Sequence, residues 1–212
     1  MNCTCSRRQL LALGALSLAL PRTSIAQGLE LLTGQATTTG KRALSISVTA
    51  NDTLLTLGHD SMLAQAGAEL EVTPGGGGIE QLVIKAGRVL SVFKPESGLR
   101  EVVLPNAVAA VRGTAVYAHH DHGEEYLCCC YGEVELSVTD APGSLILQQQ
   151  YHRAHVFKAG LAPIPAPYQA PAFHFDDELM LLEATQNRQP HWKLPDGQML
   201  FKRPGPLPKT RG

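Results

Sequence analysis

The sequence predicts an all-β protein, a single antiparallel sandwich or roll with one short helix near its C-terminal end. Short segments of alternating apolar and polar residues are separated by turn signals about every 8 to 12 residues, a spacing typical of sandwiches and rolls. Among 212 residues, 20 glycines and 14 prolines supply those turns. Because 44% of the residues are hydrophobic, a chain of this length can bury the core of one domain.

Residues 1–26 have the features of a signal peptide. Arg7 and Arg8 precede a moderately apolar run that ends at Leu20, and the small residues Ser24 and Ala26 stand where a signal peptidase cleaves. The adjacent arginines indicate the bacterial twin-arginine route, which exports folded proteins to the periplasm; an ordinary secretory signal with two basic residues is the alternative. The apolar run is shorter than the about 20 residues that span a bilayer, so we expect no stable membrane span after cleavage.

The rest of the chain divides into four parts by composition. We expect residues 27–43 to be a flexible polar lead-in and residues 44–160 to form the β domain. Residues 161–190 begin with a proline-rich run, which cannot join a strand ladder and should wrap the β domain, and continue into a short helix from about Asp176. Residues 191–212 form a basic, proline-rich tail. The formal net charge of −1 gives no electrostatic footprint for nucleic acid.

A central strand is predicted between Val108 and Tyr117, because both of its alternating faces are mostly apolar. Arg112 lies inside this strand, and a buried guanidinium is costly unless it is paired. We therefore interpret Arg112 as a buried cross-strand tether, with ligand binding as the alternative. Gly113 beside it leaves space for the close approach of another backbone.

Three histidines, His119, His120 and His122, fall where a tight turn should follow this strand. Neutral imidazole is a strong ligand for zinc, copper and nickel, so this cluster could chelate a divalent metal. We interpret such chelation as adventitious rather than as a selected metal site.

The three consecutive cysteines in the next strand carry the more specific signal. Strand alternation places Tyr126, Cys128 and Cys130 on one face, and it places Cys129 on the other face together with Leu127 and Tyr131. Three free thiols in an oxidising compartment need a partner. A disulfide between neighbours on an extended strand has poor geometry, whereas a metal ion would hold two thiolates of one face together.

Histidines in later segments supply the remaining ligands of a metal site. His152 and His155 lie on or just beyond the strand that should return beside the cysteines, and His174 precedes the predicted helix. Two thiolates and two imidazoles form a closed zinc site, and the same set can also hold iron or copper. We expect Cys128, Cys130, His155 and His174 to be the ligands, with His152 as the substitute. A disulfide within or between chains, or buried thiols with solvated histidines, remain alternatives.

The order of these motifs resembles a FecR-like subgroup of the exported, all-β FecR domain. The resemblance covers most of the chain from about residue 44 to 188 and is carried by Arg112-Gly113-Thr114, Tyr117, Cys128-Cys129-Cys130-Tyr131-Gly132, Tyr151-His152-Arg153-Ala154-His155 and His174-Phe175-Asp176-Asp177-Glu178-Leu179. Two positions depart from the pattern: the histidines are spaced rather than adjacent, and Phe175 stands where a small hydroxyl residue is expected. The resemblance implies an all-β fold and a role in envelope signalling or iron-related physiology.

The sequence shows no nucleophile elbow, no Rossmann or Walker pattern and no His-Glu-x-x-His helix. We therefore expect an exported, non-enzymatic binding or sensing module with a metal site. Its partner would be an envelope protein or a small ligand, and not nucleic acid. Two rival hypotheses are a periplasmic thiol or metal redox protein that uses Cys128 and Cys130, and a scaffold whose strand edge pairs with an envelope protein.

Overall fold

The computed structural model describes residues 24–26, 28–40, 42–95, 98–167, 172–196 and 199–208. Most of the predicted signal peptide, residues 1–23, lies outside this part of the chain. The described elements are β1 (Ser24–Ala26), β2 (Leu29–Leu31), β3 (Gln35–Thr39), β4 (Leu44–Ala50), β5 (Thr53–Leu57), β6 (Asp60–Ala64), β7 (Glu69–Gly75), β8 (Gly78–Val92), β9 (Arg100–Leu104), β10 (Ala107–Asp121), β11 (Glu124–Val138), β12 (Leu145–Gln149), β13 (Arg153–Phe157), β14 (Ile164–Pro165) and α1 (Asp176–Thr185). No helix in these ranges is long and apolar enough to cross a membrane.

The described strands belong to one sheet, and the predicted all-β class with a short C-terminal helix is confirmed. The main path runs β1-β2-β5-β6-β8-β9-β10-β11-β13-β14, while β3, β4, β7 and β12 branch from it. Strand β8 pairs with both β9 and β10, which also pair with each other, so the sheet closes on itself there. Five strands form a closed barrel, and the other described strands are added to it. The sequence predicted a sandwich or roll and not a barrel.

The long hairpin of β10 and β11 is the centre of the sheet. Its turn consists of His122 and Gly123, whose φ angles of 49° and 76° are both positive, as a two-residue type I′ turn requires. The sequence prediction placed His119 and His120 in this turn as well, but both lie within β10. Their side chains therefore point to opposite faces of the strand, and the predicted cluster of three imidazoles does not form.

Two β-bulges interrupt the pairing of β10 with β11. Arg112 pairs with Glu133 and Ala115 with Tyr131, and the next pair joins Val116 to Cys129. Cys130 is therefore the extra residue of the second bulge. The bulge shifts the alternation by one position, so that Tyr131 follows Cys130 into the same core instead of lying with Cys129, as the sequence predicted.

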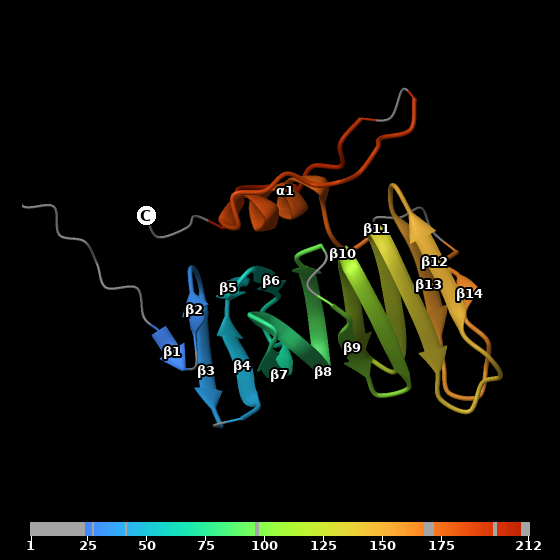
Figure 1. Cartoon of the computed structure of the whole chain (residues 1–212), viewed down its shortest axis with the longest axis horizontal. Helices are drawn as coiled ribbons and strands as arrows, with labels where there is room; N and C mark the ends of the chain where they lie inside the picture. The colour runs from blue at the N-terminus through green and yellow to red at the C-terminus, as the bar shows by residue number, and fades with distance from the viewer. Residues whose placement is uncertain are drawn as a thin grey trace, which may run out of the picture.

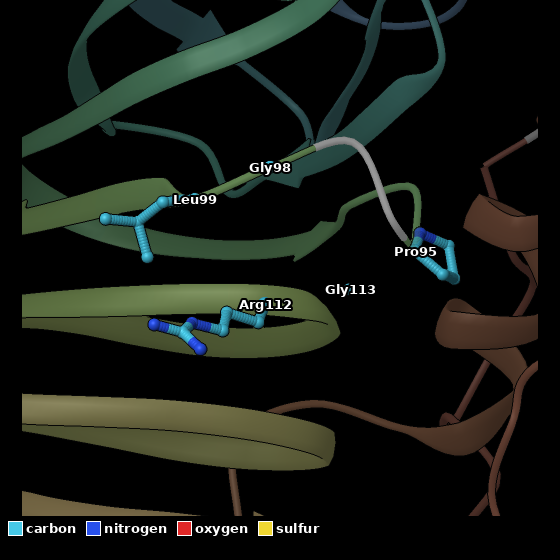
Figure 2. A pocket seen from close by; sticks show the side chains of 5 residues that line it. All are labelled: Pro95, Gly98, Leu99, Arg112 and Gly113. Carbon is cyan, nitrogen blue, oxygen red and sulfur yellow. The ribbon is translucent and has the colours of Figure 1, made fainter.

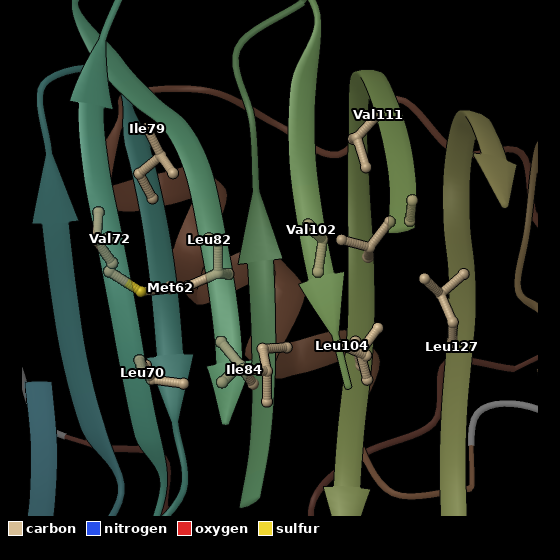
Figure 3. Packing of buried hydrophobic residues seen from close by; sticks show 14 of the residues in the cluster. Met62, Leu70, Val72, Ile79, Leu82, Ile84, Val102, Leu104, Val111 and Leu127 are labelled. Carbon is tan, nitrogen blue, oxygen red and sulfur yellow. The ribbon is translucent and has the colours of Figure 1, made fainter. Parts of the chain in front are cut away.

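The buried side chains form two cores. The first core is aliphatic and includes the side chains shown in Figure 3, among them Met62, Leu70, Val72, Ile79, Leu82, Ile84, Val102, Leu104, Val111 and Leu127. The second core is richer in aromatic and sulfur-containing side chains and consists of Leu54, Leu63, Leu90, Val92, Ala115, Tyr117, Tyr126, Cys128, Cys130, Tyr131, Ala154, Leu179 and Leu182. Cys129 belongs to the first core and Cys128 and Cys130 to the second, as strand alternation predicted for these three residues.

Helix α1 covers the second core. It lies across the ends of the strands and packs against β6 and β8 (Figure 1), and it buries Leu179 and Leu182. It begins at Asp176, as predicted, and the three acidic residues in its first turn suit the positive end of the helix dipole. Phe175 has no side-chain oxygen to cap the helix, but its backbone N–H donates to Glu178 Oε2 over 2.9 Å, which satisfies that group.

Two segments that the sequence assigned to irregular structure contain strands. The predicted flexible lead-in forms β2 and β3, because Leu29 is fully buried and the threonine-rich stretch of β3 has strong β-propensity. In the proline-rich run, Ile164 and Pro165 pair with β13 as β14. Proline is tolerated there because β14 ends the path of the sheet, where a missing N–H breaks no ladder bond.

Candidate metal centre

Four side chains that can bind a metal meet in one buried place: Cys128, Cys130, His152 and His174. Their nearest ligand atoms all lie within 4.8 Å of one another. They come from three segments, because both cysteines lie on β11, His152 lies between β12 and β13, and His174 lies just before α1. The group therefore connects the sheet to the helix that covers it.

Local structure fixes the direction of each side chain. Strand alternation places Cys128 and Cys130 on the same side of β11. The backbone N–H of His152 donates to the carbonyl of Cys130 over 2.9 Å, which holds the loop against the cysteine strand. The ring of His174 stacks on the ring of Tyr117, with centroids 4.6 Å apart and planes inclined by 11°. The cluster is thus organised by contacts that do not involve the ligand atoms themselves.

The distances between ligand atoms are close to the edges of a tetrahedron. The sulfur of Cys130 lies 3.2 Å from His174 Nε2, and the sulfur of Cys128 lies 3.7 Å from His152 Nδ1. The two imidazole nitrogens lie 3.2 Å apart. With Zn–N of about 2.0–2.1 Å and Zn–S of about 2.3 Å, tetrahedral geometry separates the ligand atoms by roughly 3.3 to 3.8 Å. Small adjustments of the four side chains would place them around one ion.

Asp176, the first residue of α1, orients His152 from behind. Its Oδ1 lies 2.8 Å from His152 Nε2, so Nε2 carries a proton, and Nδ1, which faces the cluster, is the nitrogen that can bind a metal. Its other oxygen accepts from the hydroxyl of Tyr151 over 2.7 Å and from the backbone N–H of Phe201 over 2.6 Å. A carboxylate behind a histidine is the usual outer partner in metal sites, where it fixes the tautomer and makes the imidazole more basic.

The cluster changes the pKa of its own members. Burial raises the pKa of the Cys128 thiol, but hydrogen bonds with Cys130 and with the two imidazoles bring it well below its ordinary value. Burial and the neighbouring Cys128 raise the pKa of Cys130. Burial lowers the pKa of His152, but hydrogen bonds with Asp176 and Cys128 raise it to about 9. The pKa of His174 is lowered by burial. The site thus favours a negative charge on sulfur inside a buried environment, which a metal cation would neutralise.

The structure brings together four of the five candidate ligands, and the expected choice of His155 over His152 was wrong. His155 lies opposite Leu127 in the pairing of β11 with β13, and opposite residues share a face of the sheet. Leu127 belongs to the first core, so His155 points away from the second core, where Cys128 lies. The substitute, His152, is the histidine that reaches the cysteines.

The Arg112-Gly113-Thr114 motif does not take part in this cluster. The Arg112 side chain is 68% exposed and faces Glu133 across the strands at 3.9 Å, so the prediction of a buried tether was wrong. Gly113, with a φ of 52°, occupies the first bulge, and it lines an open surface pocket together with Arg112 and Leu99 (Figure 2). Arg112 is regularly paired before the bulge and shares a strand face with Val108, which is 39% exposed, so this face is open to solvent there. The Thr114 side chain is outside the described part of the chain. Gly132, with a φ of 93°, follows Tyr131 on β11.

The residues around the cluster that the sequence reasoning missed are Asp176 and Tyr151. The sequence predicted Asp176 only as the start of the short helix, and acidic residues suit the first turn of any helix. Tyr151 precedes His152 in the same motif, but its hydroxyl contact depends on the helix docking against the loop. A carboxylate two residues after a candidate histidine ligand was the available signal. Neither the spacing of these residues nor strand alternation shows that this carboxylate contacts His152 rather than His174.

Comparisons with known proteins give only a partial structural likeness. No family model matches the chain, and no curated protein matches it. Two crystal structures from Parabacteroides distasonis ATCC 8503, each described as "a putative anti-sigma factor", are similar with TM-scores of 0.46 and sequence identities of 14% and 13%. The matches cover 58% and 57% of this chain and the same shares of the two other chains. The chain therefore spans less than two thirds of either structure, and a likeness of this size carries no argument about function.

Proposed function

We propose that this chain is an exported, non-enzymatic binding or sensing module whose fold is fastened by one metal ion, zinc by preference, held by Cys128, Cys130, His152 and His174. One observation supports the proposal above all others: four buried donor side chains of the right type, from three separate segments, converge in one place. Two thiolates and two imidazoles fill a tetrahedral coordination sphere completely. A metal held in this way has no open position for substrate, so its role is structural rather than catalytic.

The cellular part of the proposal rests on the sequence. The arginine pair and apolar run of residues 1–26 support export by the twin-arginine route to the periplasm, and the ordered motifs support a FecR-like role in envelope or iron-related signalling. Export after folding suits this site, because a metal can then be loaded before translocation. An envelope protein or a small ligand would be the partner.

The test is the metal content of the protein purified without a histidine tag. We expect about one equivalent of zinc by elemental mass spectrometry, free thiols at all three cysteines of β11 under denaturing conditions, and loss of the metal in the Cys130→Ser variant. The matched control is Cys129→Ser, which changes the adjacent thiol in the first core and should keep the metal. Cobalt substitution should give the thiolate charge-transfer bands of a tetrahedral site. Metal-free protein, or equal metal loss in both variants, contradicts the proposal.

A second candidate function, thiol redox chemistry, is favoured by the same two sulfur atoms. The Cys128 and Cys130 sulfurs lie within 4.8 Å of each other, and Cys130 is the extra residue of a bulge, where the backbone departs from that of an ordinary strand. This alternative predicts a Cys128–Cys130 disulfide in the purified, metal-free protein. A peptide map under non-reducing conditions distinguishes the two functions.

A further inference from the structure

The C-terminal strap, defined as residues 199–204, runs back along the start of α1 (Figure 1). Phe201 and Asp176 are joined twice: the Asp176 N–H donates to the Phe201 carbonyl over 2.8 Å, and the Phe201 N–H donates to Asp176 Oδ2 over 2.6 Å. Asp176 is the carboxylate that holds His152. The strap is therefore one hydrogen bond away from the residue that orients a proposed metal ligand.

Arg203 anchors the strap through three acidic residues. Its guanidinium donates to Glu178 Oε1 over 2.9 Å and to Asp52 Oδ2 over 2.6 Å. Its backbone N–H donates to Asp177 Oδ1 over 3.1 Å. Asp52 lies between β4 and β5, so a single arginine joins the strap, the helix and the sheet. These contacts are polar, and the Arg203 side chain is 26% exposed.

The strap has no fully buried apolar side chain. Leu200 and Phe201 are half-buried, Met199 is 83% exposed, and Lys202 is also exposed. Segments held by partly exposed polar contacts with little buried apolar surface open at a low free-energy cost, far below that of global unfolding. Partly exposed ion pairs are also weakened by salt. The four ligand side chains, by contrast, are fully enclosed, so some segment has to move before a metal can leave.

We propose that the C-terminal strap controls metal exchange: docked, it clamps Asp176 and hence His152, and lifted, it frees His152 to release the ion. The inference rests on the metal site proposed above. Arg203 and the backbone of Phe201 act as positioning elements, because they reach the metal only through Asp176. Mutating the outer partner of a metal-bound histidine typically lowers metal affinity by about 10- to 100-fold. We expect most of this loss of affinity to come from faster release of the metal.

The experiment measures zinc release from the loaded full-length chain to an excess of a chromogenic chelator. A chain ending at residue 198 should release zinc at least about 10-fold faster, whereas a chain ending at residue 204, which keeps the strap, should match the full chain. Arg203→Ala should behave like the shorter chain, and Lys202→Ala, which removes the neighbouring exposed charge, should have no effect. Raised salt should accelerate release from the full chain and not from Arg203→Ala.

The outcomes distinguish a failure of the inference about the strap from a failure of the proposed metal site. If the full-length chain holds no stoichiometric metal, the proposed function and the inference both fail. If it holds metal and every variant releases it at the full-length rate, only the inference fails. The cobalt spectrum of each variant should keep its band positions, because the four ligands are unchanged; a shifted spectrum would mean that the strap alters the ligand set and would overturn an effect on exchange alone. If the shorter chain does not fold, Arg203→Ala decides the question.

Discussion

The two cores of this protein lie on strands of one sheet but are built from different chemistry. The first core is almost entirely aliphatic, so its stability follows from apolar area removed from water. The second core contains three tyrosines, two cysteines and, beside them, buried His174, Asp176 and Glu183. Buried polar groups are costly unless each has a partner. The comparison shows that apolar burial can hold the strands together, whereas the helix side depends on specific polar partners.

The polar partners of the second core form connected groups. Asp176 joins His152, Tyr151 and the strap, and the Tyr131 hydroxyl donates to Glu183, which is also paired with Arg188. Such networks specify one arrangement when every member is satisfied and lose much of their value when one member is removed. A metal bound by His152 would connect the Asp176 group to the two cysteines. The difference between the cores can therefore be tested by removing the metal.

Metal removal should give the largest effect and should be confined to the second core. Without the ion, a thiolate and two facing imidazoles are left in a buried site, and structural zinc contributes on the order of 10 kcal/mol of binding free energy in small zinc domains. We expect amide protection to fall by at least about 100-fold in residues 126–131 and 176–182, and to change little in β4 and β7. Hydrogen exchange with mass spectrometry, with and without chelator, measures this. Equal loss of protection in both cores would show that they are not separable.

Replacing His152 or His155 by alanine tests the same comparison between the two cores. His152→Ala should abolish stoichiometric metal binding, because it removes one of four ligands. His155→Ala is the matched control: this side chain is also buried, but it lies on the face of the first core. It should keep the metal and lose only about 1 to 3 kcal/mol of stability. Elemental analysis and chemical denaturation of the two variants would decide, and metal loss on His155→Ala alone would reverse the ligand assignment.

The histidine result also shows where sequence reasoning succeeded and where it stopped. Alternation correctly placed Cys128 and Cys130 together and Cys129 apart, since a strand period of two fixes faces without knowledge of neighbours. It could not choose between His152 and His155, because that choice depends on the register of β13 against β11 and on a loop outside the strand. Register is a property of two segments, and a single segment does not encode it.

The missed features have similar causes. A bulge cannot be read from alternation, so Tyr131 was assigned to the wrong core. Arg112 was expected to be buried because both faces of its strand are mostly apolar, but the face that it shares with Val108 is open to solvent. The tail from residue 191 has no apolar periodicity, so its docking on α1 had no sequence signal. Its contacts are hydrogen bonds and ion pairs with residues far away in the chain, such as Asp52. The all-β class and α1 were predictable because both follow from local patterns.

The smallest predicted effect concerns Glu178, at the edge of the second core. Burial, which outweighs the Phe175 N–H and Arg203, raises the pKa of Glu178 from 4.5 to about 7. Between these values the unfolded chain has lost the proton while the folded chain keeps it, so the unfolded state binds fewer protons and stability falls as pH rises from about 4.5 to 7. Above that range the loss is complete and constant.

Glu178→Gln removes this titration while keeping an oxygen for the Phe175 N–H. Relative to the unchanged protein, the variant should gain up to about 3 kcal/mol of unfolding free energy between pH 4.5 and 8, because the pKa rises from 4.5 to about 7 and one pKa unit corresponds to about 1.4 kcal/mol. Asp177→Asn, a change at the half-buried neighbouring carboxylate, is the matched control variant. Denaturant titrations across this pH range measure the difference. A pH-independent difference between Glu178→Gln and the unchanged protein would show that this carboxyl titrates alike in both states, and that the second core tolerates its charge.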